Sequence, residues 1–245
     1  MSNHKKQAAA VFLHGFQGSP QQFAFLFPVA RECGFEVCPL LLPGHGGDYR
    51  TFINNGRDAW KAYVRAELGR LRNEYERLLL VGHSMGGLLG ILAGLENPDG
   101  IYGIFAIALP LHLRVSYAGI RNNWKYASGS GEEDAHIQTA RKFCSVTGIT
   151  LWNTPLMLPR LFDLVALSTK ARRRLCDLKI PLAILHSQHD EWVSAHSLQT
   201  AERCLLNPPS ILLLPESGHF FYTEADMQRS IDHFSIFARA CLTQK

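Results

Sequence analysis

The pentapeptide Gly82-His83-Ser84-Met85-Gly86 restricts the fold of this chain more than any other stretch of its sequence. It directly follows Leu78-Leu79-Leu80-Val81, an apolar run typical of a strand that is buried on both faces. Residues 85–96 are apolar nearly all round, which predicts a helix buried against the sheet of that strand. A strand that turns this abruptly into a helix, with glycine on either side of a serine, raises the serine above the carboxyl edge of a parallel sheet. The pentapeptide therefore predicts an α/β fold built around this junction.

Strand and helix patterns alternate along most of the chain, as in a mostly parallel sheet with helices on both faces. Ser19 and Pro20 are typical of a helix start, and Gly34 is typical of the end of that helix. Pro39 places the second predicted strand near an edge of the sheet, because proline cannot donate to a ladder. We expect strands at 11–13, 36–42, 78–81, 103–109, 182–186 and 211–214, and helices at 19–33, 58–75, 85–96 and 224–242.

The alternation breaks down between residues 110 and 177. This stretch holds a flexible, acidic Ser/Gly run at 128–134, surrounded by helical patches rich in Trp and Phe. We therefore expect one domain whose core comprises residues 1–109 and 178–245, with residues 110–177 inserted as a small cap. A chain of 245 residues with 47% hydrophobic content is long enough to bury such a core.

Composition and charge exclude several classes of partner. The net charge is only +4 and no sustained basic stripe is present, so we expect no nucleic-acid partner. We interpret the basic run Arg172-Arg173-Arg174 as a solvated helix face. No segment approaches the roughly 20 apolar residues of a membrane span. Residues 1–7 lack the apolar stretch of a signal peptide, so we expect a cytoplasmic protein.

The cysteines and clustered histidines do not predict a metal site. The six cysteines are scattered without a C-x-x-C pair, which argues against a zinc site or a disulfide framework and favours reduced thiols. His186, His189 and His196 lie close together in the sequence, but their spacing fits neither strand nor helix geometry for a metal. We expect no bound metal.

Two loops downstream of Ser84 carry residues that could activate a serine. Asp190 and His219 each follow one of the last two predicted strands. A serine hydroxyl needs a neutral imidazole to take its proton and a carboxylate to fix the tautomer of that imidazole. The order Ser, Asp, His along the chain is the one expected for a serine at such a junction. We predict Ser84, Asp190 and His219 as catalytic residues, with Glu191 and Asp177 as alternative acids.

The loop after the first predicted strand could stabilise negative charge at this site. It can present the backbone N–H of Phe16 to a developing oxyanion, and the N–H of Met85 would be the second donor. We interpret the neighbouring His14, His83 and His45 as structural residues.

Substrate contacts are predicted for three side chains. Phe16 and Met85 flank the serine in the predicted fold, and Trp152 is one of several aromatic residues of the insertion. Aromatic side chains at helical spacing also fill small hydrophobic cores, and we expect only two or three of those in the insertion to face the substrate.

With these residues placed, the chain resembles the α/β-hydrolases, and more narrowly the small-cap bacterial carboxylesterases and monoacylglycerol lipases. The resemblance covers nearly the whole chain outside the insertion, and in that family the catalytic triad and oxyanion donors correspond to the residues predicted above. It implies that the substrate is a small-molecule acyl ester. The ester would be hydrolysed through an acyl-serine intermediate, without a metal or organic cofactor. The motifs that carry it are Leu13-His14-Gly15-Phe16-Gln17-Gly18, Leu42-Pro43-Gly44-His45-Gly46, Val81-Gly82-His83-Ser84-Met85-Gly86-Gly87, Ile180-Pro181-Leu182 with His189-Asp190, and Ser217-Gly218-His219.

Two alternatives stay open at this point. The same triad could hydrolyse thioesters or amides, or transfer the acyl group to an alcohol. A hydrolase-fold protein that binds a small ligand without turnover is an alternative of another class, although such proteins typically lack a triad member. If His219 is the base, activity should rise with pH through about 6 to 7, the range of an ordinary imidazole. The physiological ester and the oligomeric state are left open.

Overall fold

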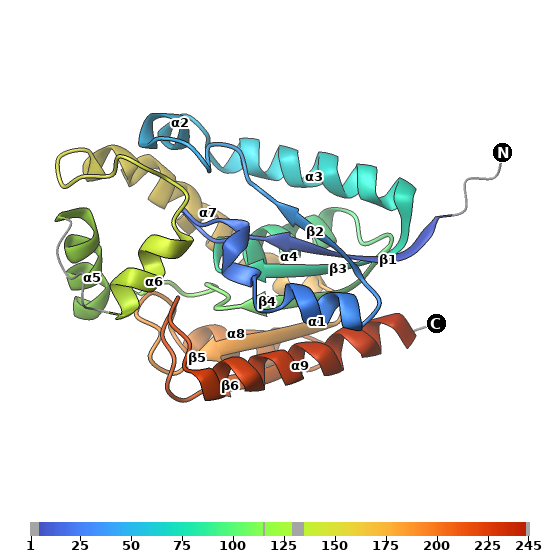
Figure 1. Cartoon of the computed structure of the whole chain (residues 1–245). Coiled ribbons are helices and arrows are strands. Elements are labelled where there is room, and N and C mark those ends of the chain that lie inside the picture. Colours follow the sequence, from blue (N-terminus) through green and yellow to red (C-terminus); the bar gives the residue numbers. More distant parts are fainter. Residues whose placement is uncertain (1–4, 115, 129–134, 244–245) are drawn as a thin grey trace.

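The computed structural model describes residues 5–114, 116–128 and 135–243. Within these residues six strands form one sheet in the order β2-β1-β3-β4-β5-β6, and every neighbouring pair is parallel (Figure 1). The predicted α/β fold is confirmed. The strands are β1 (Lys6–Leu13), β2 (Glu36–Leu40), β3 (Tyr75–His83), β4 (Ile101–Ile107), β5 (Leu182–Ser187) and β6 (Ser210–Leu214).

Helices lie between the strands along the chain. Strand β2, which carries Pro39, forms an edge of the sheet as predicted. Residues 129–134 of the predicted flexible run lie outside the described residues. The helices are α1 (Phe27–Glu32), α2 (Tyr49–Ile53), α3 (Arg57–Glu74), α4 (Met85–Glu96), α5 (Tyr117–Ser128), α6 (Ala135–Phe143), α7 (Leu158–Arg174), α8 (His196–Cys204) and α9 (Glu224–Thr243), with 3-10 turns η1 (Pro20–Phe23), η2 (Thr154–Met157) and η3 (Leu175–Asp177).

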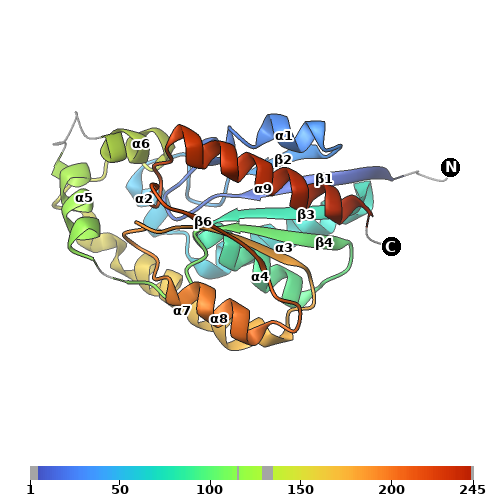
Figure 2. The ribbon, with the colours of Figure 1, turned by 90° about the horizontal axis from the view of Figure 1, so that it is seen from below.

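Alternate side chains of the strands enter two hydrophobic layers. In β3, Leu78 and Leu80 belong to one buried cluster, whereas Leu79 and Val81 belong to the other, because successive residues of a strand face opposite sides. Helices α1 and α9 cover the face of Leu79, and α3, α4, α7 and α8 cover the opposite face (Figure 2). Burial on both faces explains why this strand is continuously apolar.

The helix predicted from Ser19 to Cys33 is divided in the structure, so this prediction was wrong. The turn η1 ends at Phe23, and α1 begins separately at Phe27. Pro28 has no N–H to donate, so a helix continuing through it would lose a hydrogen bond, whereas proline fits the first turn of a new helix. Gly34 follows α1 with a φ of 92°, the left-handed conformation in which glycine ends helices.

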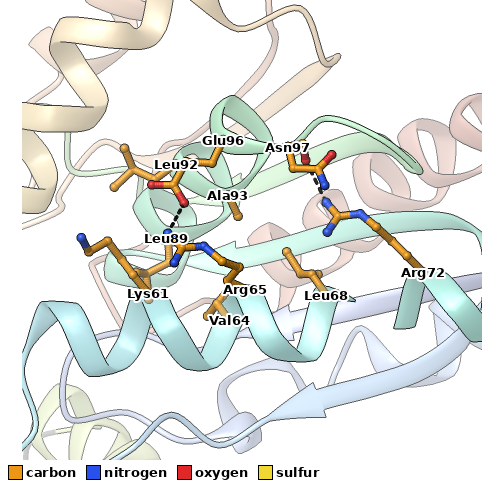
Figure 3. A pocket seen from close by; sticks show the side chains of 10 residues that line it. All are labelled: Lys61, Val64, Arg65, Leu68, Arg72, Leu89, Leu92, Ala93, Glu96 and Asn97. Carbon is orange, nitrogen blue, oxygen red and sulfur yellow. Dashed lines mark hydrogen bonds and ion pairs between the residues drawn. The ribbon is translucent and has the colours of Figure 1, made fainter. Parts of the chain in front are cut away.

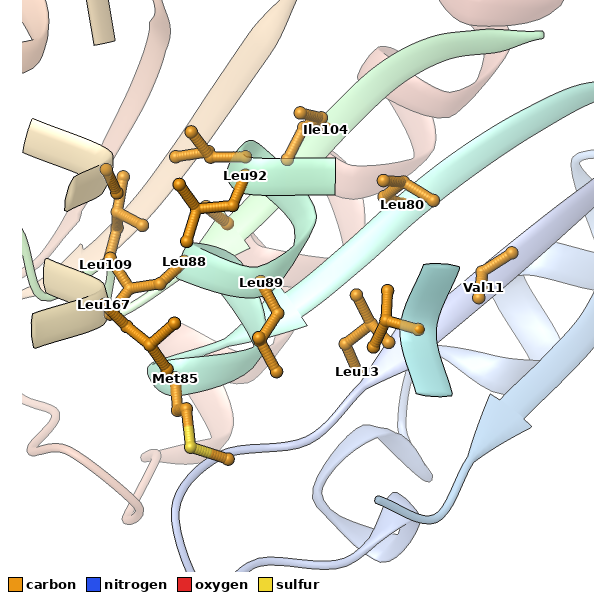
Figure 4. Packing of buried hydrophobic residues seen from close by; sticks show 14 of the residues in the cluster. Val11, Leu13, Leu80, Met85, Leu88, Leu89, Leu92, Ile104, Leu109 and Leu167 are labelled. Carbon is orange, nitrogen blue, oxygen red and sulfur yellow. The ribbon is translucent and has the colours of Figure 1, made fainter. Parts of the chain in front are cut away.

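The chain between β4 and β5 forms α5, α6, η2, α7 and η3. Helices α5 and α6 lie at the end of the molecule opposite both chain termini (Figures 1 and 2). Helix α7 packs against α4, and its Leu164 and Leu167 belong to the same buried cluster as Met85 and Leu88 (Figure 4). This part of residues 110–177 therefore shares the hydrophobic core of the sheet, and the limits of the inserted cap stay a prediction.

Candidate active site

The junction between β3 and α4 forces Ser84 into a strained backbone conformation. Ser84 has φ 50° and ψ −116°, a region that residues other than glycine rarely adopt. The flanking glycines are required by close contacts between segments of the main chain. A Cβ atom at Gly86 would lie 1.7 Å from the carbonyl oxygen of Leu13, and one at Gly82 would lie 2.4 Å from the nitrogen of Gly87. The G-x-S-x-G pattern therefore follows from the tightness of the turn itself, at Gly82, and from its packing against the end of β1, at Gly86.

Asp190 and His219 meet at the carboxyl edge of the sheet, where β5 and β6 end. Nδ1 of His219 lies 2.8 Å from Oδ2 of Asp190. The other carboxylate oxygen accepts the backbone N–H groups of Trp192 and Val193, each at 2.8 Å. Asp190 is 1% exposed and His219 is 4% exposed, so this pair is shielded from water. The carboxylate thus fixes the orientation of the ring and leaves Nε2 as the nitrogen able to accept a proton.

The environment of this pair favours its charged form. Burial alone would raise the pKa of Asp190, but the charge and hydrogen bond of His219 and the two backbone N–H groups lower it below its ordinary value. Burial alone would lower the pKa of His219, but the charge and hydrogen bond of Asp190, together with the charge of Glu191, raise it above its ordinary value. An imidazolium formed at His219 is therefore stabilised in place.

His83 connects the loop of His219 to the turn that carries Ser84. Its Nε2 donates to the carbonyl oxygen of His219 at 3.0 Å, and the two rings pack with centroids 4.9 Å apart. Burial, then the nearby His219, lowers the pKa of His83 to about 3, so its ring stays neutral. Because His83 directly precedes Ser84, this contact ties the loop of the predicted base to the turn of the predicted nucleophile.

The loop after β1 lies against the same serine. A Cβ atom at Gly15 would lie 3.4 Å from Cβ of Ser84. The loop turns sharply, since the N–H of Gly18 donates to the carbonyl oxygen of Gly15 at 3.0 Å and Gln17 has a φ of 57°. Phe16 is thus held within a tight turn whose residue Gly15 lies against Ser84, and its role as oxyanion donor stays a prediction.

Ser145, between α6 and η2, holds this loop from the other side. Its N–H donates to the carbonyl oxygen of Gln17, its hydroxyl donates to that of Gly18, and the N–H of Gly46 donates to its Oγ at 3.2 Å. The sequence offered no signal for this residue, because a single serine in an irregular stretch has no distinguishing pattern. Ser145, which lies in the predicted insertion, therefore helps to fix the shape of the predicted oxyanion loop.

The three predicted substrate contacts lie in different environments. Phe16 is half-buried, and its ring packs edge-on against Phe52 at 5.1 Å. Met85 has no exposed surface and lies in the core cluster with Leu88 (Figure 4). Trp152 is 94% exposed at the surface. The role of each in substrate contact stays a prediction.

His14 and His45 have the buried positions expected of structural residues. Nε2 of His14 accepts the N–H of Leu42 at 3.0 Å, and its Nδ1 lies 2.9 Å from the carbonyl oxygen of Gly15. Burial lowers the pKa of His14 to about 3 and that of His45 to about 4. The rings of His14 and His45 pack 4.6 Å apart, so both brace the loops after β1 and β2 as neutral groups.

The structure distinguishes the three carboxylates that the sequence offered as orienting acid. Only Asp190, of these three, contacts the ring of His219. Glu191 accepts the backbone N–H of His219 at 3.0 Å instead, and Asp177 pairs with Arg174 at the surface. The loop of Asp190 is itself anchored, because the guanidinium of Arg114 donates to the carbonyl oxygen of Asp190.

A pocket of about 200 Å³ lies elsewhere, between α3 and α4 (Figure 3). Its charged side chains already have partners. Arg65 pairs with Glu96 at 2.8 Å, and Arg72 donates to the carbonyl oxygens of Asn97 and Asp99. None of the predicted catalytic residues lines it, and nothing in its chemistry points to a ligand.

Two further findings concern the described part of the chain alone. In residues 5–114, 116–128 and 135–243, no three His, Cys, Asp or Glu side chains come together as they do around a metal ion. Over the same residues, no helix combines the length and apolar character needed to cross a membrane.

Comparison with known proteins identifies the family. The model of the alpha/beta hydrolase family matches residues 10–231. The chain belongs to this family. Among related alpha/beta hydrolases, a thermostable monoacylglycerol lipase of Bacillus sp. (strain H-257) is 26% identical over 186 residues, which are 75% of this chain and 70% of the lipase.

Solved structures of lipolytic enzymes share the fold of this hydrolase. The monoacylglycerol lipase of Paleococcus ferrophilus superposes with a TM-score of 0.74 at 16% identity, over 98% of this chain and 96% of the lipase. A structure from a study of the metagenome-derived lipolytic enzymes LipS and LipT superposes with a TM-score of 0.73 at 23% identity, over the same shares of the two chains. At these identities the likeness concerns the fold.

Proposed function

We propose that this chain is a serine esterase that cleaves carboxylic esters with short to medium acyl chains, or monoacylglycerols, through an acyl-serine intermediate. The observation that carries the proposal is the buried 2.8 Å hydrogen bond between His219 and Asp190. His83, which directly precedes the strained Ser84, donates to the main chain of the same histidine. This arrangement supplies a nucleophile, a base of fixed tautomer and an acid that orients it.

In the first half of the reaction, Oγ of Ser84 bonds to the carbonyl carbon of the ester while its proton passes to Nε2 of His219. The π electrons of the carbonyl move to its oxygen. The N–H groups of Phe16 and Met85 donate to this oxyanion, and the N-terminus of α4 adds its dipole. The carbonyl then re-forms as the bond to the leaving oxygen breaks, and the imidazolium of His219 gives its proton to the departing alcohol.

In the second half, a water molecule takes the place of the alcohol. His219, neutral again, accepts a proton from the water as its oxygen bonds to the acyl carbon. The second oxyanion collapses, the bond to Oγ breaks, and Ser84 regains its proton from His219. The products are a carboxylic acid and the free enzyme.

The proposed substrate class rests on the related proteins, whereas the proposed chemistry rests on the geometry of the site. The related Bacillus protein is a monoacylglycerol lipase at 26% identity, which favours esters with a single acyl chain. A similar reaction on thioesters would use the same groups, so the substrate has to be determined by competition between esters and thioesters of the same acyl chain.

The test is hydrolysis of a p-nitrophenyl ester series, from acetyl to palmitoyl, and of 1-monoacylglycerols, by the wild-type protein and Ser84→Ala. Ser210→Ala is the matched control, because Ser210 is an exposed serine at the start of β6. We expect turnover to peak at one chain length, to fall by a factor of about 10⁴ or more in Ser84→Ala, and to be unchanged in Ser210→Ala.

A covalent probe gives a second readout. A fluorophosphonate should add one label to the wild-type protein, and mass spectrometry should locate it on Ser84. Equal hydrolysis by the wild type and Ser84→Ala, or a label on another residue, would rule out the proposed mechanism. Saturable ligand binding without turnover would instead support a non-catalytic binding protein.

A further inference from the structure

Glu191 places a second carboxylate against the predicted base. Its side chain is turned into the protein, with the residue 8% exposed, and Oε2 accepts the backbone N–H of His219 at 3.0 Å. The adjacent Asp190 accepts Nδ1–H from the ring of the same histidine at 2.8 Å. Two successive residues of one loop therefore hold His219 at two points, one on the ring and one on the main chain.

The main chain of Glu191 is fixed as well. Its carbonyl oxygen accepts the hydroxyl of Ser116 at 2.7 Å, just before α5, and the N–H of Arg114 donates to the carbonyl oxygen of Trp192 at 3.0 Å. The carboxylate thus extends from a loop that is anchored on its outer side. Its position is set by the fold and not by a flexible side chain alone.

Burying a carboxylate that serves only as a hydrogen-bond acceptor is unfavourable, because the charge loses its hydration. Removing a carboxylate from water is strongly unfavourable unless a positive charge lies nearby, and an amide or a main-chain carbonyl could accept the same N–H. The positive charge that forms next to Glu191 during the proposed reaction is the imidazolium of His219. The negative charge of Glu191 therefore suits a position next to His219, which gains a proton in each half of the proposed cycle.

The other titratable groups around His219 do not supply this charge. His83 packs on its ring and is kept neutral by burial, and His186 at the end of β5 has a pKa lowered by burial. The hydroxyl of Tyr222 is buried without a partner within the described residues, and burial raises the pKa of Tyr222 far above its ordinary value. Arg114 contacts the main chain of Asp190. Within the described residues, Asp190 and Glu191 are thus the carboxylates that contact this histidine.

We propose that Glu191 is a positioning residue for the base: it fixes the main chain of His219 so that Nε2 faces Ser84, and its charge supports the imidazolium. This inference rests on the proposed function. Of the causes that act on the pKa of His219, burial lowers it, whereas the charge of Asp190, the hydrogen bond of Asp190 and the charge of Glu191 raise it.

Two substitutions separate the hydrogen bond from the charge. Glu191→Gln keeps an acceptor of nearly the same shape and removes the charge. We expect it to retain kcat to within about tenfold and to move the acidic limb of the kcat/KM profile to lower pH, because a lower pKa leaves the base neutral at lower pH. Glu191→Ala removes both, and we expect kcat to fall roughly tenfold to a hundredfold with little change in KM, since the base is misplaced.

The matched control is Glu216→Ala. It removes an exposed carboxylate from the loop of His219, three residues before that histidine. We expect its pH profile and its kcat to match those of the wild type. Because glutamine fills the volume of glutamate, Glu191→Gln decides the question even if Glu191→Ala does not fold.

The outcomes distinguish this inference from the proposed function. If Ser84→Ala is inactive while both Glu191 variants match the wild type in kcat and in the position of the acidic limb, the role of Glu191 is refuted and the esterase mechanism stands. If Ser84→Ala retains full activity, the mechanism itself fails and the inference fails with it. If the acidic limb of the kcat/KM profile shifts equally in Glu191→Gln and in the control Glu216→Ala, the role of Glu191 is also refuted.

Discussion

The contact between Gly86 and the end of β1 allows a sharp test of the turn at Ser84. A Cβ atom at position 86 would lie 1.7 Å from the carbonyl oxygen of Leu13, 2.5 Å from its carbonyl carbon and 2.8 Å from the carbonyl oxygen of His14. All three atoms belong to the main chain, so no side-chain rotation can relieve the clash. Helix α4 and β1 would have to separate by about 1.3 Å for the shortest distance to reach 3.0 Å.

The free-energy cost of Gly86→Ala follows from this displacement. Overpacking in a close-packed core costs about 1–3 kcal/mol and occasionally more, and a rigid main-chain obstacle belongs at the upper end of that range. Alanine gains at most about 1 kcal/mol over glycine in a helix, and less in the first turn. We therefore expect Gly86→Ala to lower the free energy of unfolding by about 2–3 kcal/mol or more. For a chain of this length that corresponds to a decrease in Tm of about 4–12 °C.

Gly69→Ala is the matched control. Gly69 lies on the exposed face of α3, and a Cβ atom there would meet no other atom within 4 Å. The same substitution should therefore stabilise the protein, by about 0.5–1 kcal/mol, since it removes conformational freedom from the unfolded chain. This corresponds to an increase in Tm of about 1–4 °C.

Differential scanning calorimetry and urea unfolding of both variants would measure these effects, and an ester assay on folded Gly86→Ala would report on the site. Because β1 leads directly into Gly15 and Phe16, the displacement should also move the predicted oxyanion loop and reduce kcat by about a hundredfold. A Tm of Gly86→Ala equal to or above that of the wild type would refute the close approach of this turn to β1. A decrease in the Tm of Gly69→Ala would show that glycine is needed at position 69 for another reason.

Three further predictions concern the site. Asp190→Asn should lower kcat by about 10³–10⁴-fold with the fold retained, because the amide no longer holds the required tautomer of His219; steady-state kinetics and circular dichroism check this, and a kcat near that of the wild type would contradict it. The kcat/KM of the wild type should rise with pH through the pKa of His219, which lies above the ordinary imidazole value, so a profile flat from about pH 5 to 8 would exclude His219 as the base. Ser145→Ala should lower kcat by about tenfold with KM nearly constant, because the hydroxyl that donates to Gly18 is lost; an unchanged kcat would show that the loop holds its shape without the insertion.

Local sequence determined the elements whose residues carry their own signals. The apolar run before Ser84, the glycines on either side and the all-apolar helix behind it predicted β3, the turn and α4. Helix 58–75 was predicted to within one residue of α3 at each end. Proline has a similar local meaning, and Pro39 placed β2 at an edge. Pro28 also indicated a break between η1 and α1. The prediction of a single helix did not use this signal.

The site was predictable in outline for the same reason. Residues that follow parallel strands lie at one edge of the sheet, so the strands that precede Ser84, Asp190 and His219 were enough to predict that all three lie at that edge. Sequence placed Asp190 first but kept Glu191 as an alternative, because two adjacent carboxylates on one loop have the same chemistry. Only the fold gives one the ring of His219 and the other its main chain.

Tertiary structure alone decided what depends on contacts between distant segments. Ser145 holds Gln17 and Gly18 across more than a hundred residues, and nothing near Ser145 in the sequence indicates it. The raised pKa of His219 likewise follows from the charge and hydrogen bond of Asp190 and the charge of Glu191, which outweigh burial, whereas the isolated residue suggested an ordinary imidazole. Sequence encodes which elements form, because propensity and periodicity are local. Packing decides the shape of a loop and the charge of a buried group, because both depend on which atoms the fold brings within a few ångströms.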